Sequence, residues 1–261
     1  VVKHTYNAQG LLEKVAVTSP ISMDYMNNIN YNAFGQVTYK KYGNNKEANI
    51  SYRTDNFRLN SISINGLQNL SFTYDNVGNI TGMTDTINAN TQSFGYDNLN
   101  RLTSASSSSS PTYSHTYVYN TIGNMTSGGG LTFTYPSATS ARPHAPISDS
   151  KYTYSYDANG NLTSKTQGSN TYTYEYDDDN QLIKVLANGA TQAMHWYNYA
   201  GARAKRDEGG TITYYVGNIY RKTGDSGTKY YFANGERIAE RNTSGNVYYY
   251  HPDHLGSSNV V

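Results

Sequence analysis

The stretch YTYSYDANGNLTS at residues 152–164 is followed by a near copy, YTYEYDDDNQLIK, at residues 172–184. In the first half of each copy tyrosines alternate with other residues, so their side chains share one face of a β-strand. Asp157 and Gly160 then have the spacing of a type I turn, in which the Asp side chain accepts hydrogen bonds from the turn amides and Gly takes a positive φ and forms a bulge. Leu162 begins a returning strand. Each copy therefore predicts one β-hairpin.

The same pattern recurs along the chain: Tyr, then Asp or Asn, then Gly or Asn three residues later. Nine copies, of which that at Tyr52 is degenerate and that at Tyr197 weak, begin at Tyr6, Tyr31, Tyr52, Tyr74, Tyr96, Tyr119, Tyr156, Tyr176 and Tyr197. The repeat positions expected to shape the hairpins include Tyr74, Asp75, Gly78, Tyr96, Asp97, Tyr119, Gly123, Tyr156, Asp157, Gly160, Tyr176 and Asp177. A spacing of about 21 residues between most copies indicates a repeat architecture.

The composition favours a sheet with one hydrated face over a thick apolar core. Tyr accounts for 28 of the 261 residues, and its ring buries apolar area while its hydroxyl needs water or a partner. A lone hairpin is marginal in water, so we expect hairpins to pair side by side, with equivalent tyrosines in a cross-strand aromatic ladder. Because strand twist disfavours a wide flat sheet, the predicted fold is all-β, with tandem hairpins in a curved, coiled sheet that forms either a tube or part of a wider spiral wall.

The hairpin pattern is interrupted once. Residues 1–126 and 151–261 are predicted to carry the repeats, whereas Gly and Pro in residues 127–150 predict an irregular insertion, with a hairpin around Leu131–Tyr135 and a crossing loop. The serine-rich stretch at residues 104–111 is expected to be a hairpin tip or exposed loop. We interpret the chain as one continuous repeat domain and as a fragment of a longer protein.

Charge and residue usage exclude several classes of function. The net charge is +1, and without a basic cluster it argues against nucleic acid or an anionic membrane as the main partner. The chain has no Cys, so disulfides and thiolate metal sites are excluded. No apolar run is long enough to cross a membrane, so no membrane insertion is expected. Since no acid–base pair or nucleophile set can be assembled from the motifs, we predict a protein that is not an enzyme and takes no cofactor.

Two further features have a structural and a functional interpretation. The GDSG at residues 224–227 resembles the nucleophile segment of trypsin-like serine proteases, but it lies between two tyrosine-rich runs, where a hairpin turn belongs. Trp196 is interpreted as a core residue beside Met194 rather than as a platform for sugar rings.

Two clusters have the residue types of metal ligands. His251, Asp253 and His254 could bind a transition metal, and the carboxylates of residues 175–179 could bind Ca²⁺. Pro252 marks a turn in the first cluster, and the spacing of the second fits no known Ca²⁺ loop. We therefore predict that neither cluster holds a metal.

The repeat resembles that of the YD-repeat, or RHS-repeat, family over essentially the whole chain. The last third carries the most specific part of the resemblance: YYVGNIYRK at residues 214–222, KYYFANGERIAER at 229–241 and YYYHPDHLGSSNVV at 248–261. There His251, Asp253, His254, Leu255 and Gly256 match a Tyr-His-x-Asp-His-Leu-Gly-Ser segment near the end of the RHS core.

The resemblance implies a fold and a function. In members of this family the repeats wind into a hollow β-shell, which in bacterial polymorphic toxins and insecticidal toxin complexes encloses a C-terminal toxin polypeptide. We therefore expect a structural shell segment of a secreted or cell-surface bacterial protein, whose partners are neighbouring repeats and the C-terminal cargo of the parent chain. The alternative is a cell-surface adhesion or carbohydrate-binding module, since exposed tyrosine rows could stack on sugars.

Overall fold

The computed structural model describes residues 1–19, 21–109 and 112–260, with the side chains of residues 258–260 excepted, and no helix occurs in these ranges. The described residues accordingly contain no helix with the length and apolar character needed to span a membrane. The predicted all-β class is confirmed. Residues 110 and 111 of the serine-rich stretch lie outside the described residues, and the adjoining part up to Ser107 lies in a strand.

The chain forms two compact units, here called unit 1 (Val1–Ser114 with Thr228–Val261) and unit 2 (His115–Gly227). The sheet that starts at the N-terminus has eleven strands, each antiparallel to its neighbour and paired in sequence order. Its strands are β1 (Val2–Tyr6), β2 (Leu12–Val17), β3 (Met23–Tyr31), β4 (Val37–Tyr42), β5 (Glu47–Tyr52), β6 (Leu59–Ile64), β7 (Gln68–Tyr74), β8 (Ile80–Asp85), β9 (Asn90–Tyr96), β10 (Leu102–Ser107) and β11 (Tyr113–Thr116).

The C-terminal part of unit 1 adds an antiparallel meander and a short two-stranded sheet. These strands are β24 (Ser226–Ala233), which begins at the unit boundary, β25 (Glu236–Asn242), β26 (Val247–Tyr249), β27 (His251–Pro252) and β28 (Ser258–Val260).

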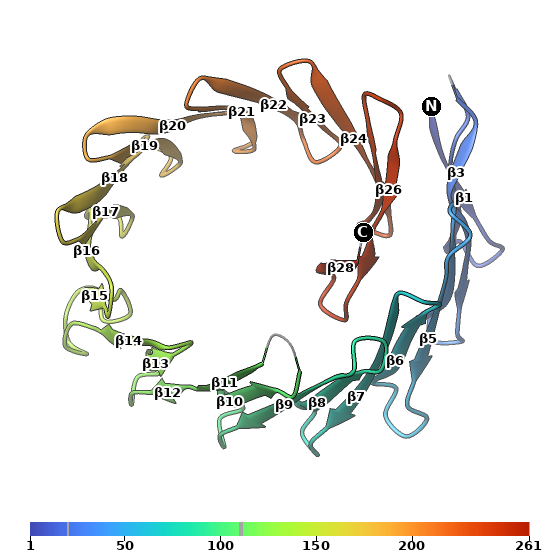
Figure 1. The fold of residues 1–261 in the computed structure, drawn as a ribbon, viewed down its shortest axis with the longest axis horizontal. Helices are drawn as coiled ribbons and strands as arrows, with labels where there is room; N and C mark the ends of the chain where they lie inside the picture. Colours follow the sequence, from blue (N-terminus) through green and yellow to red (C-terminus); the bar gives the residue numbers. More distant parts are fainter. Residues whose placement is uncertain (20, 110–111, 261) are drawn as a thin grey trace. The chain divides into compact units, whose positions relative to one another are not determined.

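Unit 2 is a series of hairpins whose strands also pair in sequence order, and Figure 1 shows them in colours from green to orange. They are β12 (Val118–Tyr119), β13 (Met125–Gly128), β14 (Leu131–Thr134), β15 (Ser148–Asp149), β16 (Thr153–Tyr156), β17 (Leu162–Gln167), β18 (Asn170–Tyr176), β19 (Leu182–Ala187), β20 (Ala190–Tyr197), β21 (Arg203–Glu208), β22 (Thr211–Val216) and β23 (Tyr220–Thr223). Residues 135–147 between β14 and β15 contain turns and loops but no strand.

The repeat turns reverse the chain at the predicted positions. Gly160 has φ 93° and Asn180 has φ 60°, the left-handed conformation that only Gly and Asn adopt readily. The strand register shifts at the adjoining tyrosine, since Ser155 pairs with Ser164 but Tyr156 pairs with Leu162. The predicted hairpin with a type I turn and a bulge is therefore confirmed in the repeat that suggested it.

Unit 1 has a core between two layers, because the meander β24–β26 packs on the N-terminal sheet, with β25 next to β3. The rings of Tyr25 and Tyr231 stack with centroids 3.7 Å apart, and Tyr25, Met26 and Ile238 are at most 2% exposed. Removing this apolar surface from water stabilises the contact between segments that lie about 200 residues apart in the chain.

Candidate functional site

Each repeat turn is held by its own acidic or amide side chain. The Asp157 Oδ1 atom accepts hydrogen bonds from the backbone N–H groups of Asn159 and Asn161, both at 2.9 Å, and Asn161 Nδ2 donates to Asp157 Oδ2 at 2.9 Å. The hydrogen bond from the Asn161 side chain, followed by those from the backbone, holds the pKa of Asp157 below its usual range against the opposing effect of burial. The carboxylate is therefore kept ionised as the acceptor that shapes the turn.

The other repeats use the same geometry. In each, the Oδ1 atom accepts from the amides two and four residues later, with Asn7, Asn32, Asp75, Asp97, Asn120, Asp177 and Asn198 as acceptors. Gly78 and Gly123 take positive φ at the expected place. The degenerate copy differs, because Phe57 with φ 59° occupies the left-handed position of a turn that is one residue longer.

The repeat tyrosines join successive hairpins through their hydroxyl groups. In seven of the repeats the hydroxyl donates to a backbone carbonyl of the chain before it, usually at the start of the returning strand of the preceding hairpin. Tyr176 reaches the carbonyl of Leu162 at 3.1 Å and Tyr74 that of Leu59 at 2.7 Å. Equivalent bonds of 2.6 to 3.1 Å are made by Tyr31, Tyr52, Tyr96, Tyr156 and Tyr197.

The expected aromatic ladder is not the link between these tyrosines. Equivalent tyrosines lie on every second strand, so they are about 9.6 Å apart at a strand spacing of about 4.8 Å, beyond the roughly 7 Å limit of ring contacts. A hydroxyl at the end of the ring extends far enough to reach the neighbouring hairpin. This explains why the repeat uses Tyr rather than Phe.

Side chains of successive repeat turns also bond to one another. Asn79 Nδ2 donates to Asn100 Oδ1 at 2.9 Å in unit 1, and Asn161 Nδ2 donates to Asn180 Oδ1 at 2.8 Å in unit 2. The Asn that follows the Gly of one turn therefore donates a hydrogen bond to the Asn with a positive φ in the next turn. The sequence indicated the Asn at that position but not this second role.

The predicted C-terminal segment contains a further copy of the repeat turn. Asp253 Oδ1 accepts from the backbone N–H groups of Leu255 at 2.9 Å and Ser257 at 3.0 Å, and Gly256 has φ 81°. We call residues 253–257 the C-terminal turn. The spacing Asp-x-x-Gly was the signal for it, although no Tyr precedes the Asp.

The C-terminal turn and the residues before it rest on the N-terminal sheet of unit 1. His251 is 1% exposed and meets the Tyr42 ring edge-on at 4.5 Å between centroids, while His254 lies 4.9 Å from Phe72. Gln68 Nε2 donates to the carbonyl of Pro252 at 3.4 Å. We call this set the C-terminal contact. It gives His251 and His254 structural roles that the sequence pattern alone did not specify.

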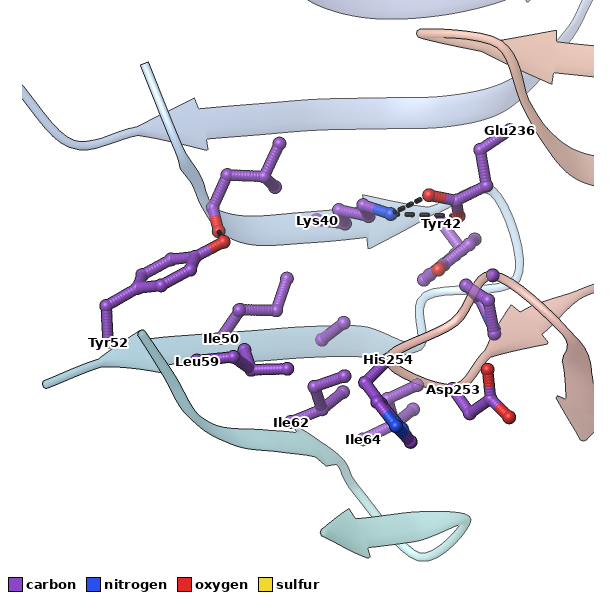
Figure 2. Close-up of a pocket in the computed structure, with 14 residues that line it drawn as sticks. Lys40, Tyr42, Ile50, Tyr52, Leu59, Ile62, Ile64, Glu236, Asp253 and His254 are labelled. Atoms are coloured by element: carbon purple, nitrogen blue, oxygen red, sulfur yellow. Dashed lines mark hydrogen bonds and ion pairs between the residues drawn. The ribbon is translucent and has the colours of Figure 1, made fainter. Parts of the chain in front are cut away.

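A pocket of about 290 Å³ lies between the C-terminal turn and strands β4–β6 (Figure 2). Ile50, Leu59 and Ile62 line it on the sheet, and His254 lines it on the side of the turn. At its margin Lys40 Nζ lies 2.6 Å from the nearer carboxylate oxygen of Glu236 on β25. Their side chains are only 13% and 27% exposed, so each charge depends on the other for compensation.

His251 is held neutral at this contact. Burial lowers its pKa to about 4, and the positive charges of Lys46 and Lys40 act in the same direction. Its Nδ1 atom has no hydrogen-bond partner among the described residues, and the same is true of His254 Nδ1 and Gln68 Oε1. Within the described ranges, no three His, Asp or Glu side chains gather in the way a metal ion requires.

Two other interpretations from the sequence can be compared with the structure. Residues 224 and 225 of the GDSG form the turn between β23 and β24, with Gly224 at φ 56°, so the turn interpretation is confirmed. The interpretation of Trp196 as a core residue is wrong, because Trp196 is 38% and Met194 39% exposed. Trp196 on β20 is paired with Lys205, whose Nζ lies 4.0 Å from the ring centroid.

These turns and hydroxyl bonds can be compared with known proteins. The family model described as RHS Repeat matches residues 156–192, which hold the hairpins at Tyr156 and Tyr176. The chain contains an RHS repeat. The predicted RHS-repeat resemblance is thereby confirmed. No curated protein sequence matches the chain.

Solved structures share the fold of this chain. The crystal structure of TcdB2-TccC3-Cdc42 matches at TM-score 0.65 and 17% identity, over 98% of this chain and 16% of that one. TcdB2-TccC3 without its hypervariable C-terminal region matches at TM-score 0.66 and 18% identity, over 98% and 16%. The Tc holotoxin pore of Photorhabdus luminescens, with a TccC3 variant, matches at TM-score 0.52 and 16% identity, over 98% and 17%. The chain thus spans about a sixth of each of these three chains.

Proposed function

We propose that this chain is a segment of the shell of a bacterial toxin protein, and that the shell encloses a C-terminal toxin polypeptide until delivery. The observation that carries the proposal is the likeness over 98% of the chain to the TcdB2-TccC3 structures. One of those structures is described as lacking a hypervariable C-terminal region. The corresponding partner of this chain is the cargo polypeptide of its parent protein, and the parent is secreted.

The hairpin series is suited to enclosure on physical grounds. A strand paired on both sides has no free backbone N–H or C=O groups, so an unfolded cargo cannot add to it as a further strand. Strands β2–β10 in unit 1 and β13–β22 in unit 2 each have two partners. The hydroxyl bonds between hairpins strengthen the sheet without any contribution from the cargo.

The role proposed for these residues is structural rather than catalytic. The side chains with specific geometry are engaged in the fold: Asp157 holds a turn, the Tyr176 hydroxyl bonds to Leu162, and His251 packs on Tyr42. The exposed Trp196 ring does not favour a carbohydrate-binding module, since Lys205 lies over its face.

Limited proteolysis of the parent protein tests the proposal. The full-length parent is digested with trypsin under native conditions, and the region downstream of residue 261 is followed by mass spectrometry. We expect that region to resist digestion as long as the repeats stay folded, and to be degraded within minutes after unfolding in urea. Equal digestion rates for the downstream region in the parent and as a separate polypeptide would refute enclosure.

A further inference from the structure

The face of the sheet that carries the C-terminal turn continues beyond it as an open groove. This groove, of about 920 Å³, is lined on β8 and β9 by Met83, Gln92 and Phe94, and on the C-terminal turn by Leu255. Leu255 is 78% exposed, although it is the large apolar residue of the turn. We call this feature the β8–β9 groove. All its lining residues belong to unit 1.

The groove extends a contact that the chain already makes with itself. Phe72, Met83 and Gln92 are cross-strand neighbours on β7, β8 and β9, so their side chains form one row on one face. His254 covers the first member of this row, with its ring 4.9 Å from Phe72. The next two members line the groove. The C-terminal turn therefore shows how a polypeptide segment packs on this row, and the row continues past it.

The polar side chains of the groove suit the backbone of an extended peptide. Asn90 Oδ1 accepts from Ser107 Oγ at 2.8 Å and Gln92 Oε1 accepts from the Tyr113 hydroxyl at 2.9 Å. These bonds fix the two amide groups, and their nitrogens have no partner among the described residues. Amide N–H groups beside an apolar surface can donate to peptide carbonyls while apolar side chains pack below them.

The charges that line the groove argue against an acidic segment. No Lys or Arg occurs among the described residues that line it. It is lined by two carboxylates: Asp85 accepts from the backbone N–H of Ile87 at 3.0 Å and from Asn88 Nδ2 at 2.6 Å, and Asp253 accepts from backbone N–H groups of the C-terminal turn. Two carboxylates without a Lys or Arg beside them would repel an acidic segment, so the apolar row and the amide groups are left to provide the affinity for an apolar one.

We propose that the β8–β9 groove binds an extended, apolar segment of the enclosed polypeptide, with an apolar side chain on Met83 and Phe94 and peptide carbonyls on Asn90 and Gln92. The inference rests on the proposed function, and it adds that the shell holds its cargo through a defined site. A polypeptide kept extended by such a site cannot complete its own fold.

Peptide binding to the purified chain tests the inference directly. The probe is a fluorescein-labelled nonapeptide, Gly-Ser-Gly-Leu-Gly-Phe-Gly-Ser-Gly, compared by fluorescence anisotropy with a version in which Ser replaces Leu and Phe. We expect the apolar peptide to bind at least about tenfold more tightly, because each buried apolar side chain contributes on that scale. Benzoylphenylalanine in place of the peptide Phe should crosslink within residues 80–96 or the C-terminal turn.

Matched variants separate the groove from general apolar adsorption. Met83→Asp and Gln92→Ala should each weaken binding of the apolar peptide, by about tenfold and about threefold. Val216→Ser, which removes an apolar side chain 56% exposed on β22 of unit 2, should leave binding unchanged. Circular dichroism establishes that each variant is folded, and Gln92→Ala keeps the test decisive if Met83→Asp does not fold.

Several results would overturn the inference. They are equal affinity for the two peptides, equal effects of the groove variants and Val216→Ser, or displacement of the peptide by maltohexaose, which would indicate a sugar site. The test is independent of the protease experiment on the parent. Resistant cargo combined with absent peptide binding refutes only the groove, whereas cargo degraded at the free rate refutes enclosure itself.

Discussion

Acidification should destabilise unit 1 through His251, and His251→Phe should remove this sensitivity. The pKa of His251 is about 4 in the folded chain, against an ordinary value of 6.5, chiefly because of burial and then because of Lys46 and Lys40. The folded state therefore disfavours the proton that the unfolded chain takes up below pH 6.5. The contribution of neutral His251 is complete above pH 6.5 and is lost as the pH falls to about 4.

The size of the effect follows from the difference between the two pKa values of His251. A tenfold change in proton affinity corresponds to about 1.4 kcal/mol, so lowering the pKa from 6.5 to about 4 corresponds to about 3 kcal/mol between pH 7 and pH 4. The neighbours of His251 do not stabilise its charged form: Tyr42 contacts it through the ring, and the charges of Lys46 and Lys40 both disfavour its proton. A protonated His251 would stand next to two lysines in an apolar setting.

Urea unfolding at pH 7, 6, 5 and 4, followed by circular dichroism, measures the effect. The Phe side chain keeps the aromatic contact with Tyr42 but cannot take a proton, so the difference in unfolding free energy between wild type and His251→Phe should change by about 3 kcal/mol across the series. His4→Phe, at an exposed position of the same unit, is the control and should follow the wild type. Parallel loss of stability in wild type and His251→Phe would refute this role for His251.

Three further substitutions test the links within each unit. Tyr176→Phe should lower the free energy of unfolding by about 1 kcal/mol in urea titrations, because the 3.1 Å bond to the Leu162 carbonyl is lost while the ring remains; an unchanged value would argue against the hydroxyl link. Gly160→Ala should lower the free energy of unfolding by about 1–2 kcal/mol in thermal unfolding experiments, because the φ of 93° strains a residue with a Cβ even where no atom lies within 4 Å of it. Gly160→Asn should lower it less, because Asn tolerates a positive φ better than Ala. Lys40→Met should lower the free energy of unfolding by about 2–3 kcal/mol, because the carboxylate of Glu236 loses its counter-charge. The double variant Lys40→Met with Glu236→Leu should recover most of that loss. A double variant as unstable as Lys40→Met would show that the two charges do not depend on each other.

The local structure of the repeats was predictable because it depends on residues close in sequence. The spacing of Asp157 and Gly160 specifies a turn whose hydrogen bonds run between residues 157 and 161, and the structure has the bonds at these positions. The alternation at Tyr152 and Tyr154 likewise predicted a strand, which the structure has at Thr153–Tyr156. Such features require no knowledge of which segments meet in space.

The C-terminal contact was not predictable in the same way. Nothing in the sequence around Tyr42 shows that His251 packs on it, because the two residues lie about 200 positions apart. The same holds for Tyr25 and Tyr231 in the core of unit 1. The family resemblance indicated that the last segment was structurally important, but not which strands it meets. The exposure of Trp196 was missed for a related reason. A large aromatic residue on a strand suits a buried or an exposed position, and the local sequence does not show that Lys205 on the next strand lies over its ring.

The two units use different sources of stability, and the difference bears on how the repeat tolerates change. Among the described residues of unit 2, Ala193 is the one buried hydrophobic side chain. The hairpins of unit 2 therefore depend on strand pairing and on bonds such as that from Tyr176 to Leu162. Links between neighbours alone allow a repeat array to lengthen or to accept an insertion without disturbing distant parts, which accounts for residues 135–147 in the middle of the series. Unit 1 lacks this freedom, because the packing of Tyr231 and Ile238 requires the meander to meet a particular set of N-terminal strands. The repeats of unit 2 can thus vary in number, whereas the meander of unit 1 has to keep its position on the N-terminal strands.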